Sequence, residues 1–364
     1  MKKLGFVKVA MLLFVLLTLS ACNMRMEEKG TVNEEPGDGM FDSENESSET
    51  DLDVIAIEKI EKYEGMEITD WIDEQTVVLA KENQELGKMS LLENAEFYPR
   101  SIYVYNLGTK EYKPIKSHKN MFLGGATLSP DKKHLLYYEY SIGDVAYYLM
   151  NLEDGEQSSV TEDNIGSAYT AEWTDEQNVI GASYSGGAYM VDTGGNLTQI
   201  AELQEEQLFT VHKMQEKIYY ITTELQVYML DVITKEKKNL QLENTDRITL
   251  SPDGKQILVT QATGSTKRLM ITDADGNIQS TITEGSDVTG ASWSPNQQMI
   301  AYQLVSDNNV DSSGLYLYDL STNKSTQITE SVGYDKIRWS PSGKKISVTE
   351  LNERIYTSSI FYIK

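Results

Sequence analysis

The stretch LSPDGKQILVT, residues 250–260, places a turn directly before a strand, and a close copy, WSPSGKKISVT, occupies residues 339–349. Proline presets the backbone angle at the second position of a turn, and aspartate and glycine suit the later positions. The apolar and β-branched residues that follow are typical of a strand. Each copy therefore predicts a short strand ending at Leu250 or Trp339, then a tight turn and a second strand.

The same pattern recurs along the chain. Trp or Leu stands before the turn in nearly every copy, and the gaps between these positions run from about 38 to 57 residues. Periods of about 40–45 residues, each with several short strands, indicate a propeller rather than a helical solenoid. The other copies are WIDEQTVVLA (71–80), LSPDKKHLLYY (128–138), WTDEQNVIGA (173–182), the weaker FTVHKMQEKIYYIT (209–222) and WSPNQQMIAY (293–302).

A hairpin of a third and a fourth strand completes six of the repeats, as in LMITDADGNIQSTI (269–282). The last repeat stops at SIFYIK (359–364) without a fourth strand, and the segment DVIAIEKI (53–60) can supply it. Such closure removes the exposed sheet edges that promote aggregation. We therefore predict that residues 54–364 form an all-β propeller of seven four-stranded blades closed by the N-terminal strand. Six blades remain the alternative if the weak fourth repeat or the long first one is not a blade.

The quoted repeats resemble those of the Tol-B-type, WD-like β-propellers of bacterial envelope proteins. The resemblance covers about 310 residues and is specific for the fold. It implies little about activity, because this fold carries peptidase gates, lyases, sensors and docking platforms alike.

The start of the chain is typical of an export signal. Three lysines lie within the first eight residues, and an unbroken apolar run follows at 9–17. The sequence LSAC at 19–22 resembles the lipobox of bacterial lipoproteins. In that family the chain is cut before the cysteine, whose thiol receives a diacylglycerol group, with acyl chains such as palmitate. The resemblance implies a lipoprotein signal peptide at 1–21 and a lipid anchor at Cys22, since two or more acyl chains bind a membrane stably. The alternative is a plain secretory signal with an incidental cysteine.

An acidic segment follows the cysteine. Residues 23–53 contain eleven Asp and Glu but only two basic residues, so we expect 22–53 to be a lipidated cysteine with a disordered, self-repelling tether. An acidic docking tail for a basic partner is the alternative. The combination of lipobox, tether and lone propeller also resembles the uncharacterised YqgU-like lipoproteins of Gram-positive bacteria. The expected location is the extracytoplasmic face of the cell membrane, or the outer membrane if the cell is Gram-negative.

The charge and the cysteine content exclude several classes of function. The chain has 32 basic and 56 acidic residues, a net charge of −24, which disfavours nucleic acid as a partner because phosphate contact needs a basic surface. A single cysteine also excludes an internal disulfide and a zinc site built on thiolates.

No segment has the pattern of a catalytic motif. GASYSGG (181–187) lacks the second glycine of a nucleophile elbow and falls within a predicted strand. The three histidines, His118, His134 and His212, are interpreted as surface or core residues. DADGN (273–277) has the spacing of a calcium loop, but it occupies the hairpin-turn position of its repeat, so we interpret it as a turn. The sequence therefore predicts no catalytic residue, metal or cofactor.

Binding residues are expected on one rim of the propeller. Antiparallel strands place the two classes of short turn on one rim and the variable loops on the other, and variable loops on a rigid scaffold commonly carry function. The longest of them, 81–101, contains Phe97 and Tyr98 and is unusually apolar for a solvated loop. We expect it either to cap the central channel or to anchor a partner through its aromatic residues.

A second candidate set consists of four aspartates that precede innermost strands. These loops would meet at the mouth of the central channel, where a carboxylate ring could bind a cation or a basic peptide. Coincidence in an acidic chain is the competing explanation. The four residues are Asp163, Asp246, Asp287 and Asp335.

Taken together, these features favour a non-catalytic binding or docking platform for an unidentified protein or envelope component. One alternative is a hydrolase or lyase that acts on cell-wall glycans through carboxylates and tyrosines. Another is a sensor or assembly factor for a membrane partner. The oligomeric state does not follow from the sequence.

Overall fold

The structure, a computed structural model, describes residues 55–90, 95–141, 145–160, 168–183, 185–307, 310–331 and 333–364. Within these ranges, the side chains of residues 168, 169, 310, 334 and 335 are not described. Cys22 and the segments predicted as signal peptide and tether therefore lie outside the described residues, as does Asp163.

Strands make up nearly all of the regular structure. Three short 3₁₀ helices are η1 (Gln84–Leu86), η3 (Ala201–Leu203) and η4 (Val310–Ser312). The first half of the strands is β1 (Ile57–Glu64), β2 (Met66–Trp71), β3 (Thr76–Glu82), β4 (Arg100–Asn106), β5 (Tyr112–Lys116), β6 (Phe122–Leu128), β7 (His134–Tyr140), β8 (Ala146–Asn151), β9 (Gln157–Ser159), β10 (Ala168–Trp173), β11 (Asn178–Ser183), β12 (Ala188–Asp192), β13 (Leu197–Gln199) and β14 (Leu208–Met214). The second half is β15 (Lys217–Thr222), β16 (Val227–Asp231), β17 (Lys237–Asn239), β18 (Thr245–Leu250), β19 (Gln256–Thr263), β20 (Thr266–Asp273), β21 (Ile278–Gly285), β22 (Asp287–Trp293), β23 (Met299–Val305), β24 (Gly314–Asp319), β25 (Lys324–Thr329), β26 (Tyr334–Trp339), β27 (Lys345–Asn352) and β28 (Ile355–Ile363). None of the helices within the described ranges is long and apolar enough to cross a membrane.

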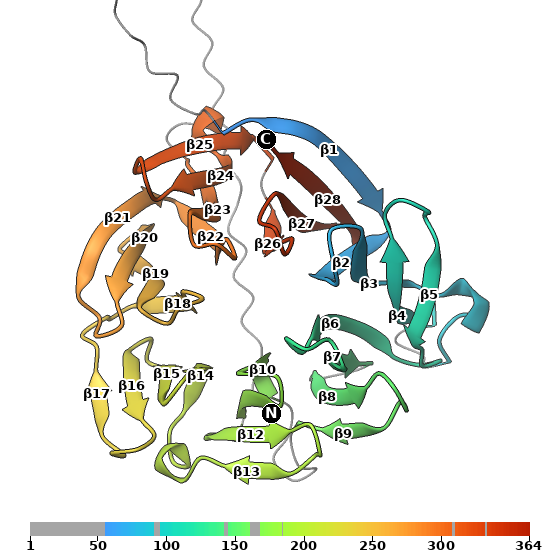
Figure 1. Ribbon diagram of the computed structural model, residues 1–364, viewed down its shortest axis with the longest axis horizontal. Helices are drawn as coiled ribbons and strands as arrows, with labels where there is room; N and C mark the ends of the chain where they lie inside the picture. Colours follow the sequence, from blue (N-terminus) through green and yellow to red (C-terminus); the bar gives the residue numbers. More distant parts are fainter. Residues whose placement is uncertain are drawn as a thin grey trace, which may run out of the picture. The chain divides into compact units, whose positions relative to one another are not determined.

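The strands form antiparallel sheets that follow one another around a common centre (Figure 1), which confirms the predicted β-propeller. Five sheets have four strands each, and a sixth contains β2 to β9. Within the described residues, the strand pairing that links the two halves of the sixth sheet, β2–β5 and β6–β9, is a single parallel pair, Arg100 with Phe122. The number of blades, seven or six, stays a prediction.

The N-terminal strand closes the ring, as predicted. β1 pairs antiparallel with β28, from Ile57 opposite Ile363 to Glu64 opposite Thr357, and it completes the sheet β1-β28-β27-β26. The strand begins four residues later than the predicted segment, 53–60. Most of its side chains are exposed, because an outermost strand packs on only one face. The positions of apolar residues in this strand therefore do not show where the strand begins and ends.

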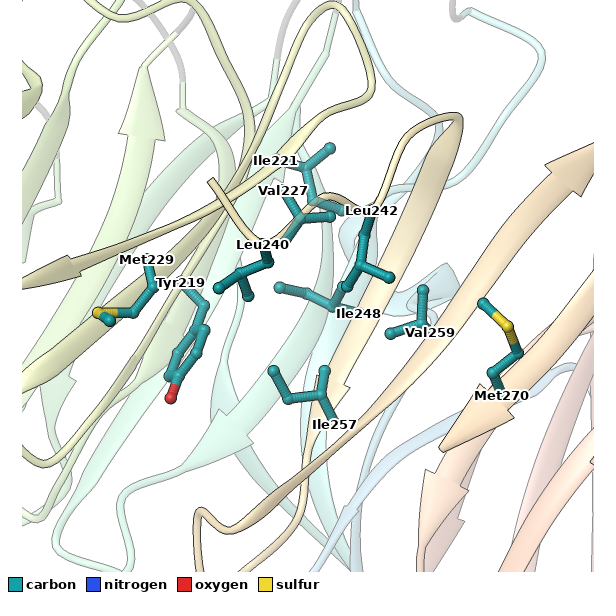
Figure 2. Packing of buried hydrophobic residues seen from close by; sticks show 10 residues of the cluster. All are labelled: Tyr219, Ile221, Val227, Met229, Leu240, Leu242, Ile248, Ile257, Val259 and Met270. Carbon is teal, nitrogen blue, oxygen red and sulfur yellow. The ribbon is translucent and has the colours of Figure 1, made fainter. Parts of the chain in front are cut away.

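The hydrophobic core lies between neighbouring sheets. Figure 2 shows ten residues of one cluster, in which side chains of β15 and β16 meet those of β18, β19 and β20. Tyr219, Ile221 and Val227 contribute from one sheet, and Ile257 and Val259 from the next, all of them 1% exposed or less. Burial of one such side chain stabilises the fold by about 1.5–3 kcal/mol. Neighbouring sheets thus bury their apolar side chains against one another.

Side-chain hydrogen bonds fix the repeated Ser-Pro-Asp-Gly turn. The Ser251 hydroxyl donates to Oδ1 of Asp253 (2.8 Å) and accepts from the backbone N–H of Gln256 (3.0 Å). Asp253 Oδ1 also accepts from the N–H of Lys255 (3.1 Å). Gly254 has a φ of +72°, a left-handed conformation that glycine adopts without strain. The turn motif is therefore explained by its own hydrogen bonds.

The second class of turn is also held by an acidic side chain. Asp273 Oδ1 accepts from the backbone N–H groups of Asp275 and Asn277, both at 2.9 Å, and Oδ2 accepts from Nδ2 of Asn277 at 2.8 Å. These bonds confirm that DADGN is a hairpin turn. They also lower the pKa of Asp273, with the side-chain bond from Asn277 as the largest cause.

The recurring place of tryptophan in the repeat has a structural reason. Three indole N–H groups each donate to a backbone carbonyl of the preceding blade, at the residue just before its own Trp or Leu. The pairs are Trp173 with Thr127 (3.2 Å), Trp293 with Thr249 (3.2 Å) and Trp339 with Ser292 (3.3 Å). Tryptophan therefore both fills the space between blades and bonds them together.

The fourth tryptophan makes the same link through a serine. Trp71 Nε1 donates to the Ser347 hydroxyl at 3.1 Å, and that hydroxyl lies 3.5 Å from the carbonyl oxygen of Arg338, the residue before Trp339. This contact joins β2 to β27 across the point where the ring closes.

Candidate binding site

A pocket of about 1290 Å³ lies on the rim of variable loops. Its walls come from the β3–β4 insertion, the β5–β6 connection, the end of β7 and the β27–β28 turn, together with residues of β4 and β5. The longest variable loop, 81–101, and the β27–β28 turn thus meet at one site. Ligand pockets are typically about 300–1,000 Å³, so this one has room for an extended ligand.

Arg100, the first residue of β4, is the most buried charged side chain of the lining, at 6% exposed. Its Nη2 donates to Glu67 Oε2 at 2.6 Å and to the carbonyl oxygen of Ala80 at 3.2 Å. The guanidinium carbon lies 4.0 Å from the ring centroid of Tyr356. Nη1 has no hydrogen-bond partner among the described residues. Half of this guanidinium group therefore lacks a protein acceptor.

Arg100 remains charged despite its burial. Burial acts to lower its pKa, but the carboxylate of Glu67 more than offsets this effect, and the pKa of Arg100 is raised. Glu67 is itself 7% exposed, so both members of the pair are removed from water. Such a pair needs good geometry to offset its desolvation, which the 2.6 Å contact provides.

Backbone contacts set the position of Arg100 between two groups of strands. Its N–H donates to the carbonyl oxygen of Met121 at 3.3 Å, just before β6. The ring of Tyr138 lies near the guanidinium and packs against Gly124, where a Cβ atom would approach the tyrosine oxygen to 2.6 Å. Glycine at 124 therefore makes room for the ring beside the buried charge.

Two further cations of the lining lie over aromatic rings. Lys81 Nζ is 4.5 Å from the centroid of Tyr112, and the Arg354 guanidinium is 4.6 Å from the centroid of Phe97. Neither cation forms an ion pair within the described part of the chain. Aromatic rings attract cations through their negative faces, by about 0.5–1 kcal/mol at exposed sites.

A row of ring contacts continues along the lining. Phe97 meets Phe122 edge-on at 6.4 Å, and Phe122 meets Tyr140 at 5.1 Å. Met89 of the insertion is buried, and its N–H donates to the carbonyl oxygen of Phe97 at 2.9 Å. The described part of the insertion is therefore folded against the propeller, with Phe97 in the pocket. Tyr98 is half-buried and is not part of the lining.

The structure brings two of the four candidate aspartates together, and neither is part of the pocket lining. Lys267 Nζ of β20 lies 2.7 Å from Asp246 Oδ2 and 3.0 Å from Asp287 Oδ1. Burial acts to lower the pKa of Lys267, but its bonds to both carboxylates raise it. Asp246 lies within β18 and Asp287 begins β22, so neither precedes its strand as expected. Asp335 lies in β26, and its side chain is not described.

The three histidines occupy different environments. His118 is exposed, and His134 begins β7 with its Nδ1 buried and without a partner among the described residues. His212 of β14 contacts Glu172 of β10 at 2.8 Å, which links two neighbouring sheets. Across the described ranges, no group of three or more His, Cys, Asp or Glu is arranged to hold a metal ion.

Sequence reasoning missed Arg100, Glu67 and Tyr356. The available signal was a basic residue at the end of an apolar insertion, directly before a strand, in an acidic chain. Its partners are 33 and 256 residues away, so no local motif contains them.

No protein-family model matches the chain, and no curated protein matches it. Solved structures that resemble it are β-propellers. The Cps50 (Swd1) β-propeller domain of Myceliophteria thermophila is 16% identical, with 83% of this chain and 100% of that one covered, at a TM-score of 0.53. An oligogalacturonate lyase from Vibrio parahaemolyticus is 10% identical over 85% and 98% of the two chains, at a TM-score of 0.63. An oligogalacturonate lyase in complex with manganese is 11% identical over 84% and 98%, at 0.55. At these identities the likeness shows the β-propeller fold alone.

Proposed function

We propose that the protein is an extracytoplasmic lipoprotein, anchored through Cys22, whose propeller binds an envelope component without catalysing a reaction. The lipobox-like LSAC at 19–22 and the acidic segment at 23–53 support the anchor and the tether. Both lie outside the described residues, so the sequence alone supports this part. The resemblance to the YqgU-like lipoproteins belongs to the same part of the proposal.

The observation that carries the binding role is the pocket around Arg100. It combines a buried cation, a row of aromatic rings in contact and an insertion that interrupts the regular repeat. Binding residues are typically presented in this way, on irregular loops of a rigid scaffold. The turns of the opposite rim use their polar side chains in internal hydrogen bonds, so the variable rim is the better candidate.

The buried carboxylate beside the pocket is held in an ion pair, and this favours a binding role over catalysis. Glu67 is paired with Arg100 at 2.6 Å and does not line the pocket, so it is not presented to a bound ligand as a nucleophile. The solved structures that resemble the chain include an oligogalacturonate lyase and the Cps50 (Swd1) β-propeller domain, and the fold is compatible with binding and with catalysis.

Crosslinking in intact cells tests the proposal. Wild type, a variant lacking residues 84–98, and Arg354→Gln are compared by affinity capture and mass spectrometry, with Lys255→Gln on the opposite rim as the matched loss of one charge. We expect an envelope component that is crosslinked by wild type and Lys255→Gln and lost from both pocket variants. Equal crosslinking by all four proteins would overturn the assignment of the pocket. A captured component that wild type converts to product would replace binding with catalysis.

Cys22→Ser tests the anchor separately. We expect this variant to leave the membrane fraction and appear in the medium or in the soluble extracytoplasmic fraction. If it stays in the membrane fraction, the lipid anchor is wrong.

A further inference from the structure

Charge is distributed unevenly within the pocket. The acidic side chains of the lining, Glu64, Glu82 and Glu85, are all exposed. The more buried charged groups are cations, because Lys81 is half-buried and Arg100 is buried. Glu67, which pairs with Arg100, is not part of the lining, so the charged groups that line the inner part of the pocket are cations, in a folded region that has 27 basic and 45 acidic residues. A ligand that places an anionic group inside and neutral groups at the edge fits this distribution.

The Nη1 branch of Arg100 needs a hydrogen-bond acceptor. Nη2 is used by Glu67 and Ala80, whereas Nη1 has no acceptor among the described residues although the side chain is more than nine-tenths buried. A buried donor without a partner costs free energy that an incoming acceptor recovers. Guanidinium groups match carboxylates in geometry and charge, so a carboxylate is the acceptor that this branch fits best.

The rest of the lining suits a ring-shaped, hydroxylated ligand. Tyr103, Tyr112 and Tyr140 present aromatic surface, and Asn83, Gln84 and Ser117 present neutral donors and acceptors. The C–H faces of a sugar pack on aromatic rings, and its hydroxyl groups both donate and accept hydrogen bonds. This mixture of flat apolar surface and neutral polar groups favours a saccharide over a peptide.

We propose that the pocket binds an acidic saccharide, with the carboxylate of a uronic acid at Arg100 and the sugar rings against the tyrosines. The inference rests on the binding function proposed above and names its ligand class. Nη1 is covered in the unliganded protein, so the carboxylate displaces a neighbouring ring to reach it. Tyr356, which stacks on the guanidinium directly after the Glu353–Arg354 turn, is the ring that moves.

Isothermal titration of the mature chain with a panel of oligosaccharides tests this ligand class. The panel contains glucuronate and galacturonate oligomers, the carboxyl-reduced form of each, and neutral chito-oligosaccharides, with short peptides that carry a free C-terminal carboxylate as the other occupant. We expect at least one uronate oligomer to bind and its carboxyl-reduced form to bind at least tenfold more weakly. Peptides should bind more weakly than the uronate oligomers.

Matched variants locate the carboxylate. Arg100→Lys keeps the charge opposite Glu67 but removes the second branch, so we expect about 10- to 100-fold weaker binding of the uronate oligomer. Lys81→Gln should weaken binding several-fold without affecting the Arg100–Glu67 pair, and it keeps the test valid if Arg100→Lys folds poorly. Lys255→Gln should bind as wild type does.

Three results would overturn the inference. They are no binding by any uronate oligomer, equal binding of the carboxyl-reduced forms, or tighter binding of the peptides. None of these results contradicts the proposed binding platform if crosslinking in cells still depends on the pocket. Loss of that crosslinking dependence would remove both proposals.

Discussion

The two rims of the propeller use their polar side chains in opposite ways. On the rim of short turns, Ser251 and Asp253 are bonded to one another and to the backbone that they bend. On the variable rim, Arg100 is bonded on one side only, and Lys81 and Arg354 contact rings instead of carboxylates. The short-turn rim thus contributes to folding, and in our proposal the cations of the variable rim interact with a ligand.

The largest expected effect comes from breaking the buried pair of the variable rim. Glu67→Gln leaves the Arg100 charge buried without its counterion, which should lower the free energy of unfolding by about 3 kcal/mol. The same variant should bind a uronate oligomer more tightly, because the ligand carboxylate then replaces the lost counterion. Urea unfolding and isothermal titration measure the two effects. Unchanged stability together with weaker binding would contradict this role of the pair.

Next in size is a change on the short-turn rim. Ser251→Ala removes the hydrogen bonds to Asp253 and from Gln256, and we expect a loss of about 1–2 kcal/mol in the free energy of unfolding. Ligand affinity should not change, because the turn is on the opposite rim. Lys255→Gln, four residues further along the same turn and exposed, serves as the control. A Ser251→Ala protein with wild-type stability would show that the turn bonds are not needed.

The closing strand offers a test with a defined pH range. Glu61 of β1 accepts from Tyr63 (3.0 Å) and Tyr362 (2.6 Å) and pairs with Lys59. Burial acts to raise its pKa, but these three partners together lower the pKa of Glu61 to about 2. Its carboxylate therefore adds stability above its ordinary pKa of 4.5, and that stability is lost as the pH falls toward 2.

Glu61→Gln should accordingly cost about 1–2 kcal/mol at pH 7 and progressively less between pH 4.5 and 2. Urea unfolding of both proteins at several pH values gives this difference. A difference that stays constant down to pH 2 would mean that the carboxylate charge is not what stabilises the closure.

The smallest expected effect lies between the third and fourth blades. Burial acts to lower the pKa of His212, but Glu172 at 2.8 Å more than offsets this and raises it. The protonated pair therefore stabilises the fold fully below the ordinary histidine pKa of 6.5, and this contribution disappears as the pH rises through the raised value.

His212→Gln should therefore cost about 0.5–1 kcal/mol at pH 5.5 and less at pH 9, since Glu172 is partly exposed and its charge is screened by solvent. Thermal unfolding of both proteins across this range measures the change. A cost that grows as the pH rises would reverse the assigned sign.

The fold could be predicted from the sequence because the residues that specify each turn and strand are close together in the chain. The turn at Ser251 and the strand after it lie within a few residues, and the pattern repeats around the ring. The limits of the closing strand were harder to place, because an outer strand such as β1 buries few side chains.

The candidate site was only partly accessible. The insertion that contains Phe97 was recognised, but Arg100 depends on Glu67 and Tyr356 from distant strands. Their positions in the repeat predict that Asp246 and Asp287 are carboxylates open to a ligand, yet Lys267, from a third strand, pairs with both. In both cases the contacting residues are far apart in the sequence, so no short motif contains them.

The most direct test of this separation between the rims measures melting temperature and uronate affinity on the same two variants, Ser251→Ala and Arg354→Gln. We predict that Ser251→Ala melts about 3–6 °C lower with unchanged affinity. Arg354→Gln, exposed at the pocket edge, should bind several-fold more weakly and melt as wild type does. If Ser251→Ala weakened binding while Arg354→Gln affected only the melting temperature, the assignment of the two rims would be wrong.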